Sequence, residues 1–152
     1  MLMADERYKR IDQFQVGDLV LSRDEDASAE EEILAGRVSK VFVHENKQVL
    51  RLRLGENVLD TTAEHPFYVV GQGWVFAAVI TLGDVVVAAD GVYHGVTGKE
   101  YLPQFETVYN IEVEGLHTYF VGSLNIWVHN KKQSVDLPLI WNPNCGQTGC
   151  AG

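Results

Sequence analysis

The stretch "FQVGDLVLSRDE", residues 14–25, is the most informative about the fold, because the chain repeats it as "ITLGDVVVAADG" at residues 80–91. In both copies a Gly-Asp pair, at positions 17–18 and 83–84, precedes three consecutive apolar residues. A single Gly-Asp turn before a strand is common, but two turns with matching flanks indicate a duplication.

A weaker match follows each copy at nearly the same distance, "SKVFV" at 39–43 and "ETVYNI" at 106–111. A repeat of about 65 residues is too long for a unit of a solenoid. We therefore expect two β-rich halves that clasp one another and are related by a pseudo-twofold axis.

The rest of the chain has the pattern of an all-β protein. Short runs rich in Val, Ile, Leu, Tyr and Phe are separated by turn residues, as is typical of strands. We find no convincing helix, and the best candidate is a turn at 11–14, while Asp90-Gly91 predicts a hairpin turn. The predicted strands span residues 18–23, 36–44, 48–55, 65–70, 73–80, 84–91, 107–115, 117–122 and 124–130.

Composition excludes several classes of function. A chain of 152 residues, 46% of them hydrophobic, is long enough for one domain with a real core. The net charge of −9 argues against nucleic acid as a partner. No apolar run is long enough for a signal peptide or a membrane span. The acidic run at 24–32, "DEDASAEEE", is expected to be a solvated loop.

The composition changes after Asn130. Residues 131–152 are rich in Asn, Gly, Pro and Lys, which is typical of a linker or of the start of another module. Cys145 and Cys150 lie in this tail and are the chain's two cysteines, so a disulfide between them would close only the tail. We predict a domain over 1–130 and a flank over 131–152, and the sequence assigns no compartment.

The last predicted strand ends on a His-Asn pair, His129-Asn130, just before that change. An Asn side-chain amide can attack its own carbonyl carbon, form a succinimide and break the peptide bond on its C-terminal side. The attacking nitrogen must lose a proton, the leaving amine must gain one, and the carbonyl oxygen must be polarised. His129 and His117, which opens a neighbouring predicted strand, are candidates for these roles, although an isolated His is more often a surface or core residue.

A second candidate pair is Thr62 and His65 in "TTAEHPFYV". A hydroxyl and an imidazole at one bend can grip a peptide bond, the first at its carbonyl and the second at its departing nitrogen. Taken alone, T-x-x-H more often marks a turn. No metal cluster, nucleotide-binding loop or serine nucleophile motif is recognisable, and we expect neither a cofactor nor a metal.

Together these pieces resemble the Hint domain, the self-processing β-fold shared by inteins and Hedgehog C-terminal domains. The resemblance is greatest to the pretoxin Hint modules that precede toxin domains in bacterial polymorphic toxins. It covers about residues 1–130, through "IDQFQVGDLVLSRDE", "TTAEHPFYV", "GQGWVFAAVITLGDVVVAADG" and "VYNIEVEGLHTYFVGSLNIWVHN".

The resemblance implies a horseshoe-like β-fold that acts once on its own flanking polypeptide, in a parent protein of the secreted toxin kind. It implies that Thr62 and His65 flank the N-terminal junction. It also implies that His117 and His129 assist Asn130 at the C-terminal junction, releasing the C-terminal flank.

Three departures bear on the reaction. Asn110 stands where many inteins carry an Asp that helps the first acyl shift. Family members begin with a nucleophilic Cys or Ser, but no Cys precedes residue 145, so we expect no acyl shift from this chain's own start. Lys131 comes directly after Asn130 and is no acyl acceptor, so we expect cleavage without ligation.

Three alternatives remain beside autoprocessing. The first is a non-catalytic Hint-type spacer or presentation module. The second is a circularly permuted or complementing Hint fragment that uses Cys150 as nucleophile, since the end "GCAG" joined to the start "MLMADE" resembles a Hint start. The third is a β-rich carbohydrate- or peptide-binding domain, which explains the strands and the Trp residues but not His129-Asn130.

Overall fold

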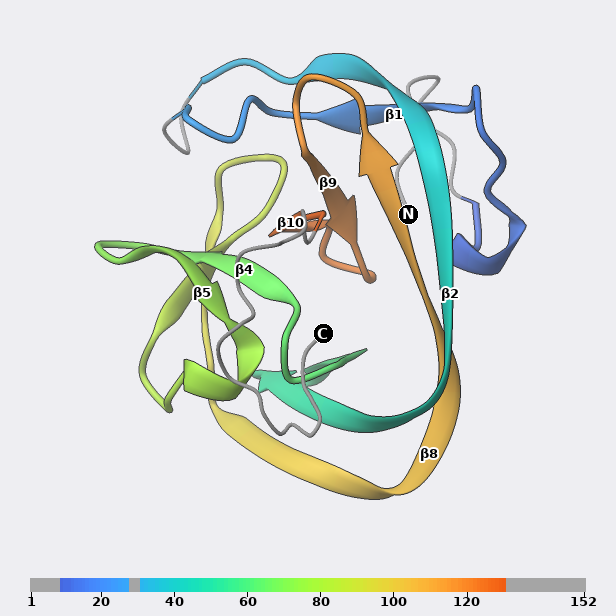
Figure 1. Cartoon of the computed structure of the whole chain (residues 1–152). Coiled ribbons are helices and arrows are strands. Elements are labelled where there is room, and N and C mark those ends of the chain that lie inside the picture. The colour runs from blue at the N-terminus through green and yellow to red at the C-terminus, as the bar shows by residue number, and fades with distance from the viewer. Residues whose placement is uncertain (1–8, 28–30, 131–152) are drawn as a thin grey trace.

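Two long antiparallel strands form the frame of the molecule. The computed structural model describes residues 9–27 and 31–130. β2 (Leu34–Leu54) pairs along most of its length with β8 (Gly98–Val113). The pair curves around the interior like a horseshoe, with register shifts near His44 and Lys47 where the ribbon bends (Figure 1). No helix among the described residues has the length and apolar character needed to cross a membrane.

The remaining strands form two sheets. β1 (Leu19–Ser22) and β3 (Asn57–Thr61) flank β2 in the first sheet. The second sheet has the order β7-β6-β4-β10-β9, with β5 paired to β4. Its strands are β4 (Pro66–Val69), β5 (Gly73–Phe76), β6 (Val85–Val87), β7 (Tyr93–Gly95), β9 (Thr118–Val121) and β10 (Ile126–His129).

The duplication predicted from the sequence is visible in matching hydrogen bonds. In each copy the Gly N–H donates to a valine carbonyl over 2.9 Å, from Gly17 to Val38 and from Gly83 to Val96. Both glycines have positive φ, 100° and 95°, which a side chain would disfavour. The Asp after each Gly accepts a hydrogen bond at its carboxylate from the N–H three residues earlier. The two Gly-Asp turns are therefore the same structure used twice.

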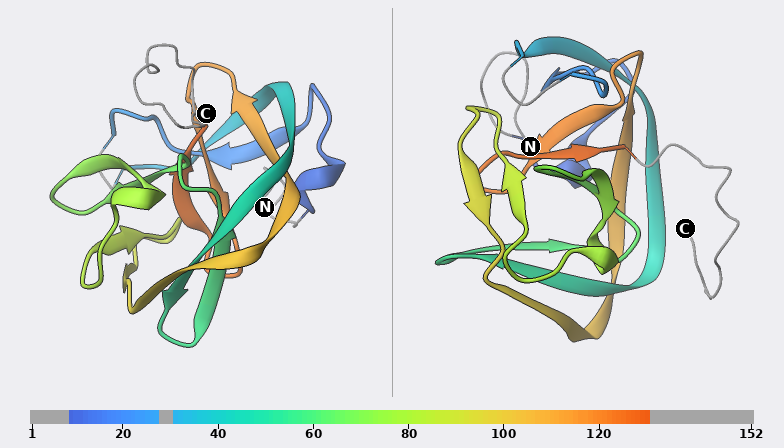
Figure 2. Two further views of the ribbon diagram at one scale, coloured as in Figure 1. Left: turned by 60° about the horizontal axis from the view of Figure 1, so that its bottom comes forward. Right: turned by 90° about the vertical axis from the view of Figure 1, so that its left-hand side faces the viewer.

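The core lies between the ribbon and the second sheet, and β9 and β10 run through its centre (Figure 2). Tyr119, Phe120, Trp127 and Val128, which come from these two strands, are completely buried. Burying each such side chain stabilises the fold by about 1.5–3 kcal/mol. The ends of β9 and β10 are consequently held in place by completely buried side chains.

The all-β prediction is confirmed, and several boundaries need correction. The predicted strands at 36–44 and 48–55 form the single strand β2, apart from Gly55, which lies in the turn after it. The predicted strand at 73–80 ends at Phe76 and continues as a 3-10 helix, Ala77–Val79, which is closed by a hydrogen bond from Ile80 N–H to the carbonyl of Ala77 over 3.2 Å.

Three strand segments escaped prediction, namely β3, β7 and the first half of β8. β3 contains Asn57 and Asp60, β7 ends at Gly95, and the first half of β8 contains Gly98 and Pro103, residue types that weaken a strand pattern. Two turn predictions are confirmed. A 3-10 helix occupies Ile11–Gln13, and Gly91 N–H bonds to the carbonyl of Ala88 over 3.0 Å, with β6 and β7 antiparallel on either side.

Candidate functional site

Asn130 lies at the end of β10 and is almost completely buried, with 1% of its surface exposed. Its backbone N–H donates to the carbonyl of His117 over 2.8 Å. When its amide is oriented so that both atoms are satisfied, Nδ2 donates to the same carbonyl over 3.1 Å and Oδ1 accepts from Val113 N–H over 2.9 Å. Backbone groups thus fix both the main chain and the side chain of this residue.

Alternation along β10 sends His129 to the other face of the strand. Val128 pairs with Tyr119 of β9 and with Phe67 of β4, so Val128 and Asn130 point to one side and Trp127 and His129 to the other. There the His129 ring packs edge-on against Trp74, with ring centres 5.1 Å apart.

The ring of His129 contacts two acceptors. Its Nδ1 lies 3.1 Å from the carbonyl oxygen of Asn130, which belongs to the peptide bond that joins Asn130 to Lys131. Its Nε2 lies 2.7 Å from Oε1 of Glu25. Both contacts are hydrogen bonds when both ring nitrogens carry a proton.

His117 completes the group from the turn before β9. Its φ is +63°, a left-handed conformation that is uncommon outside glycine. In this conformation the His117 carbonyl oxygen points toward Asn130 and accepts its backbone N–H. Its ring stacks against that of His129, with centres 6.3 Å apart, and its Nε2 lies 3.8 Å from Oε2 of Glu25. Its Nδ1 is buried and has no hydrogen-bond partner among the described residues.

Glu25 is the residue that the sequence analysis missed. It belongs to the acidic run predicted to be a solvated loop, and its side chain is only 30% exposed. Its backbone carbonyl accepts a hydrogen bond from Trp74 Nε1 over 3.0 Å. Its position at the end of the repeated stretch, two residues after the buried Arg23 that directly follows β1, is the only sequence signal that could have distinguished it from the other acidic residues.

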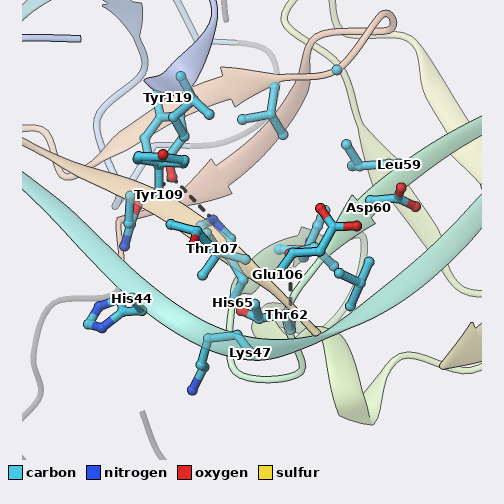
Figure 3. A pocket seen from close by; sticks show the side chains of 18 residues that line it. His44, Lys47, Leu59, Asp60, Thr62, His65, Glu106, Thr107, Tyr109 and Tyr119 are labelled. Carbon is cyan, nitrogen blue, oxygen red and sulfur yellow. Dashed lines mark hydrogen bonds between the residues drawn. The ribbon is translucent and has the colours of Figure 1, made fainter. Parts of the chain in front are cut away.

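Thr62 and His65 line a cavity of about 370 Å³ between β2, β3, β8 and β9 (Figure 3). His65 N–H bonds to the carbonyl of Thr62 over 3.3 Å, so the T-x-x-H motif does form a turn. His65 Nε2 lies 3.5 Å from the hydroxyl of Tyr119, and that hydroxyl donates to Oδ1 of Asn110. Complete burial raises the pKa of the Tyr119 hydroxyl far above its usual value, so it remains a donor.

The five predicted site residues therefore fall into two groups. Thr62 and His65 line the cavity, whereas His117, His129 and Asn130 gather around Glu25 and are not among the cavity's lining residues. The groups are neighbours, because β4, β10 and β9 are successive antiparallel strands. The start of β4 after His65, the end of β10 and the start of β9 consequently share one end of the sheet.

Within residues 9–27 and 31–130 no group of three or more His, Cys, Asp or Glu side chains is arranged to hold a metal ion. Lys131, Cys145 and Cys150 lie outside the described residues, as does the predicted flank over 131–152.

Comparison with known proteins agrees with the resemblance seen in the sequence. The family described as "Pretoxin HINT domain" matches residues 1–131. A bacterial intein-like domain from Clostridium thermocellum has a similar structure, with a TM-score of 0.76 and 31% identity over 85% of this chain and 92% of that one. A search of curated proteins found no match.

Two inteins share the fold at lower identity. The DnaB intein from Synechocystis sp. PCC 6803 has a TM-score of 0.70 and 21% identity, over 84% of this chain and 91% of that one. The gp41-1 intein has a TM-score of 0.67 and 22% identity, over the same shares of the two chains. Domains of this fold are self-processing and act on the polypeptide joined to them. The horseshoe-shaped, duplicated β-fold and the match over residues 1–131 show that this chain belongs to the pretoxin Hint family.

Proposed function

We propose that this domain cuts the peptide bond after Asn130 by cyclisation of the Asn130 side chain, and so separates residues 1–130 from the C-terminal flank. The observation that carries the proposal is the 3.1 Å contact between His129 Nδ1 and the carbonyl oxygen of Asn130. This oxygen belongs to the bond that would break. The reaction is a single turnover on the protein's own chain, without a cofactor.

The bonds balance without water. Asn130 Nδ2 attacks the Asn130 carbonyl carbon and loses a proton, giving a tetrahedral intermediate whose oxygen carries the negative charge. The bond from that carbon to the Lys131 nitrogen then breaks, and this nitrogen gains a proton and leaves as a free amine. The products are a chain that ends in an aminosuccinimide and a second chain that begins with Lys131.

Two histidines can serve this sequence. A proton on His129 Nδ1 polarises the carbonyl during attack, and the same proton lies near the nitrogen that leaves. His117 contributes through its carbonyl, which binds the amide of Asn130 over 3.1 Å. Its ring stacks against that of His129, and we assign it the role of proton acceptor. Each positioned acid or base typically accelerates a reaction by about 10²–10⁴-fold.

Thr62 and His65 are proposed to act at the other junction. They line the cavity beside Asn110 and Tyr119, and this cavity is large enough for a short peptide segment. Asn110 replaces the acid of many inteins, and its Oδ1 accepts a hydrogen bond from the Tyr119 hydroxyl. An amide neither takes up nor releases a proton near neutral pH, so Asn110 contributes to an acyl shift through hydrogen bonding alone.

Ligation is not part of the proposal. Joining the flanks requires a thiol or hydroxyl directly after Asn130 to accept an acyl group, and Lys131 has neither. The two backbone bonds that hold the Asn130 amide must also break or shift before attack, which favours a slow reaction and a long-lived intact chain.

The experiment is a time course of the full chain at 25 °C and neutral pH, analysed by gel and by N-terminal sequencing of the released piece. Wild type should yield a new N-terminus at Lys131, and Asn130→Ala should yield none. Asn57→Ala, at an exposed position in β3, is the matched control and should cleave like wild type. If the folded wild type stays whole over days, with or without added thiol, the spacer interpretation replaces autoprocessing.

A further inference from the structure

We infer that Glu25 is a positioning residue of the C-terminal junction, whose carboxylate orients His129 and His117 for the cut after Asn130. The inference rests on the proposed function. It assigns a role to a loop that comes more than one hundred positions earlier in the chain than the histidine it contacts.

The two oxygens of this carboxylate face the two histidines separately. Oε1 lies 2.7 Å from His129 Nε2, and Oε2 lies 3.8 Å from His117 Nε2. The first is a hydrogen bond of the short, charge-assisted kind, and the second is within ion-pair distance. One side chain thereby bridges the two rings.

The loop that carries Glu25 is held at two points, at Glu25 itself and at Arg23. Trp74 Nε1 holds the Glu25 carbonyl, and the Trp74 ring also packs against His129. Before the loop, the Thr118 hydroxyl is bonded to both the N–H and the carbonyl of Arg23. Because Thr118 directly follows His117, the same contact ties the Glu25 loop to the second histidine.

The orientation has a chemical consequence. A carboxylate accepts only, so the His129 nitrogen facing Glu25, Nε2, is the one that carries the proton in the neutral ring. The ring is then oriented with Nδ1 toward the Asn130 carbonyl oxygen, and the second proton that the ring takes up is placed on that contact. Carboxylate partners of this kind commonly decide the orientation of functional histidines.

Glu25 differs in this from the acidic residues around it. Asp24 and Asp26 are exposed, and the Asp24 carboxylate is used locally, accepting from Asp26 N–H over 2.9 Å. Glu32, which is also exposed, has the same side chain and charge and is therefore the matched control.

The test uses Glu25→Ala, Glu25→Asp and Glu32→Ala in the full chain, with thermal unfolding to show that each variant is folded. We expect Glu25→Ala to slow cleavage after Asn130 by roughly 10–100-fold, by analogy with the loss that follows removal of the partner of a metal-binding histidine. Glu25→Asp keeps the charge on a shorter arm and should be intermediate. Glu32→Ala should match wild type.

A second measurement separates positioning from a general structural effect and does not depend on cleavage. In the uncleaved Asn130→Ala background, ¹⁵N NMR of the neutral imidazoles should show the His129 proton on Nε2. Adding Glu25→Ala should move it toward Nδ1, and Glu32→Ala should leave it in place.

If wild type does not cut, the proposed function fails, and the NMR comparison alone decides the role of Glu25. An unchanged His129 proton position in Glu25→Ala would overturn the inference, whether or not cleavage slows. Wild-type cleavage by a folded Glu25→Ala variant would overturn it as well.

Discussion

Replacing His117 by alanine and by glycine separates the contribution of its backbone from that of its ring. The residue has φ +63°, a conformation that costs a residue with a Cβ roughly 1–2 kcal/mol and costs glycine almost nothing. Both replacements remove the same ring. The glycine variant should therefore unfold at a higher temperature than the alanine variant, by a difference that corresponds to about 1 kcal/mol, or roughly 3–5 °C in a domain of this size.

Cleavage should not vary in the same order. The His117 carbonyl still reaches the Asn130 amide in both variants, whereas neither has a ring beside His129 and Glu25. If the ring moves a proton, both variants should cut about 10²–10⁴-fold more slowly than wild type. Thermal unfolding and a cleavage time course on the same samples provide the two readouts. A His117→Gly variant that cuts as fast as wild type would refute the role given to the ring and leave only the backbone role.

Two further predictions concern the frame around the site. Thr118→Val removes the buried hydroxyl that is bonded to the N–H and carbonyl of Arg23. Because each buried group that loses its partner costs about 1–3 kcal/mol, the free energy of unfolding in urea should fall by about 2–4 kcal/mol. Thr118→Ser keeps the hydroxyl and should lose only about 1 kcal/mol, so equal losses in the two variants would contradict the explanation. The pKa of Asp18 is lowered by its hydrogen bond with Lys9 and then by the N–H of Gln15. The Asp18 carboxylate therefore contributes to stability above its ordinary pKa of about 4, and this contribution is lost as the pH falls through the lower folded pKa. Because the pair is partly exposed, Asp18→Asn should lower the free energy of unfolding by less than about 1 kcal/mol at neutral pH. The difference in stability between variant and wild type should disappear in acid, and a difference that grows in acid would contradict the assigned sign.

The sequence predicts the fold well because the same Gly-Asp turn, followed by the same kind of strand, occurs twice in it. The Gly-Asp turns at 17–18 and 83–84 need glycine at positive φ and an Asp that caps the turn, and both requirements can be recognised from the sequence alone. Strand limits are harder to predict, because β2 continues through the register shift between His44 and Lys47, where Asn46 has a positive φ of 57°, instead of ending there.

The candidate site was predictable only where the proposed chemistry restricts the residue type. Asn130 and His129 are adjacent in the sequence, and the proposed cyclisation requires an Asn at the cut and a proton donor beside it. Glu25 carries no such restriction, because a carboxylate in an acidic run is usually solvated. Its contact with His129 depends on how β1 crosses β9, which only the folded chain brings about.

The mass of the first product is the most direct test of cleavage by cyclisation of Asn130. The full wild-type chain should be incubated at neutral pH and analysed promptly by intact mass spectrometry beside Asn130→Ala. Cyclisation predicts a fragment 1–130 that is lighter by one water molecule than the same fragment with a free carboxylate, together with a partner that begins at Lys131. A fragment 1–130 that carries a full carboxylate from its first appearance, or that forms equally in Asn130→Ala, would contradict cleavage by Asn130.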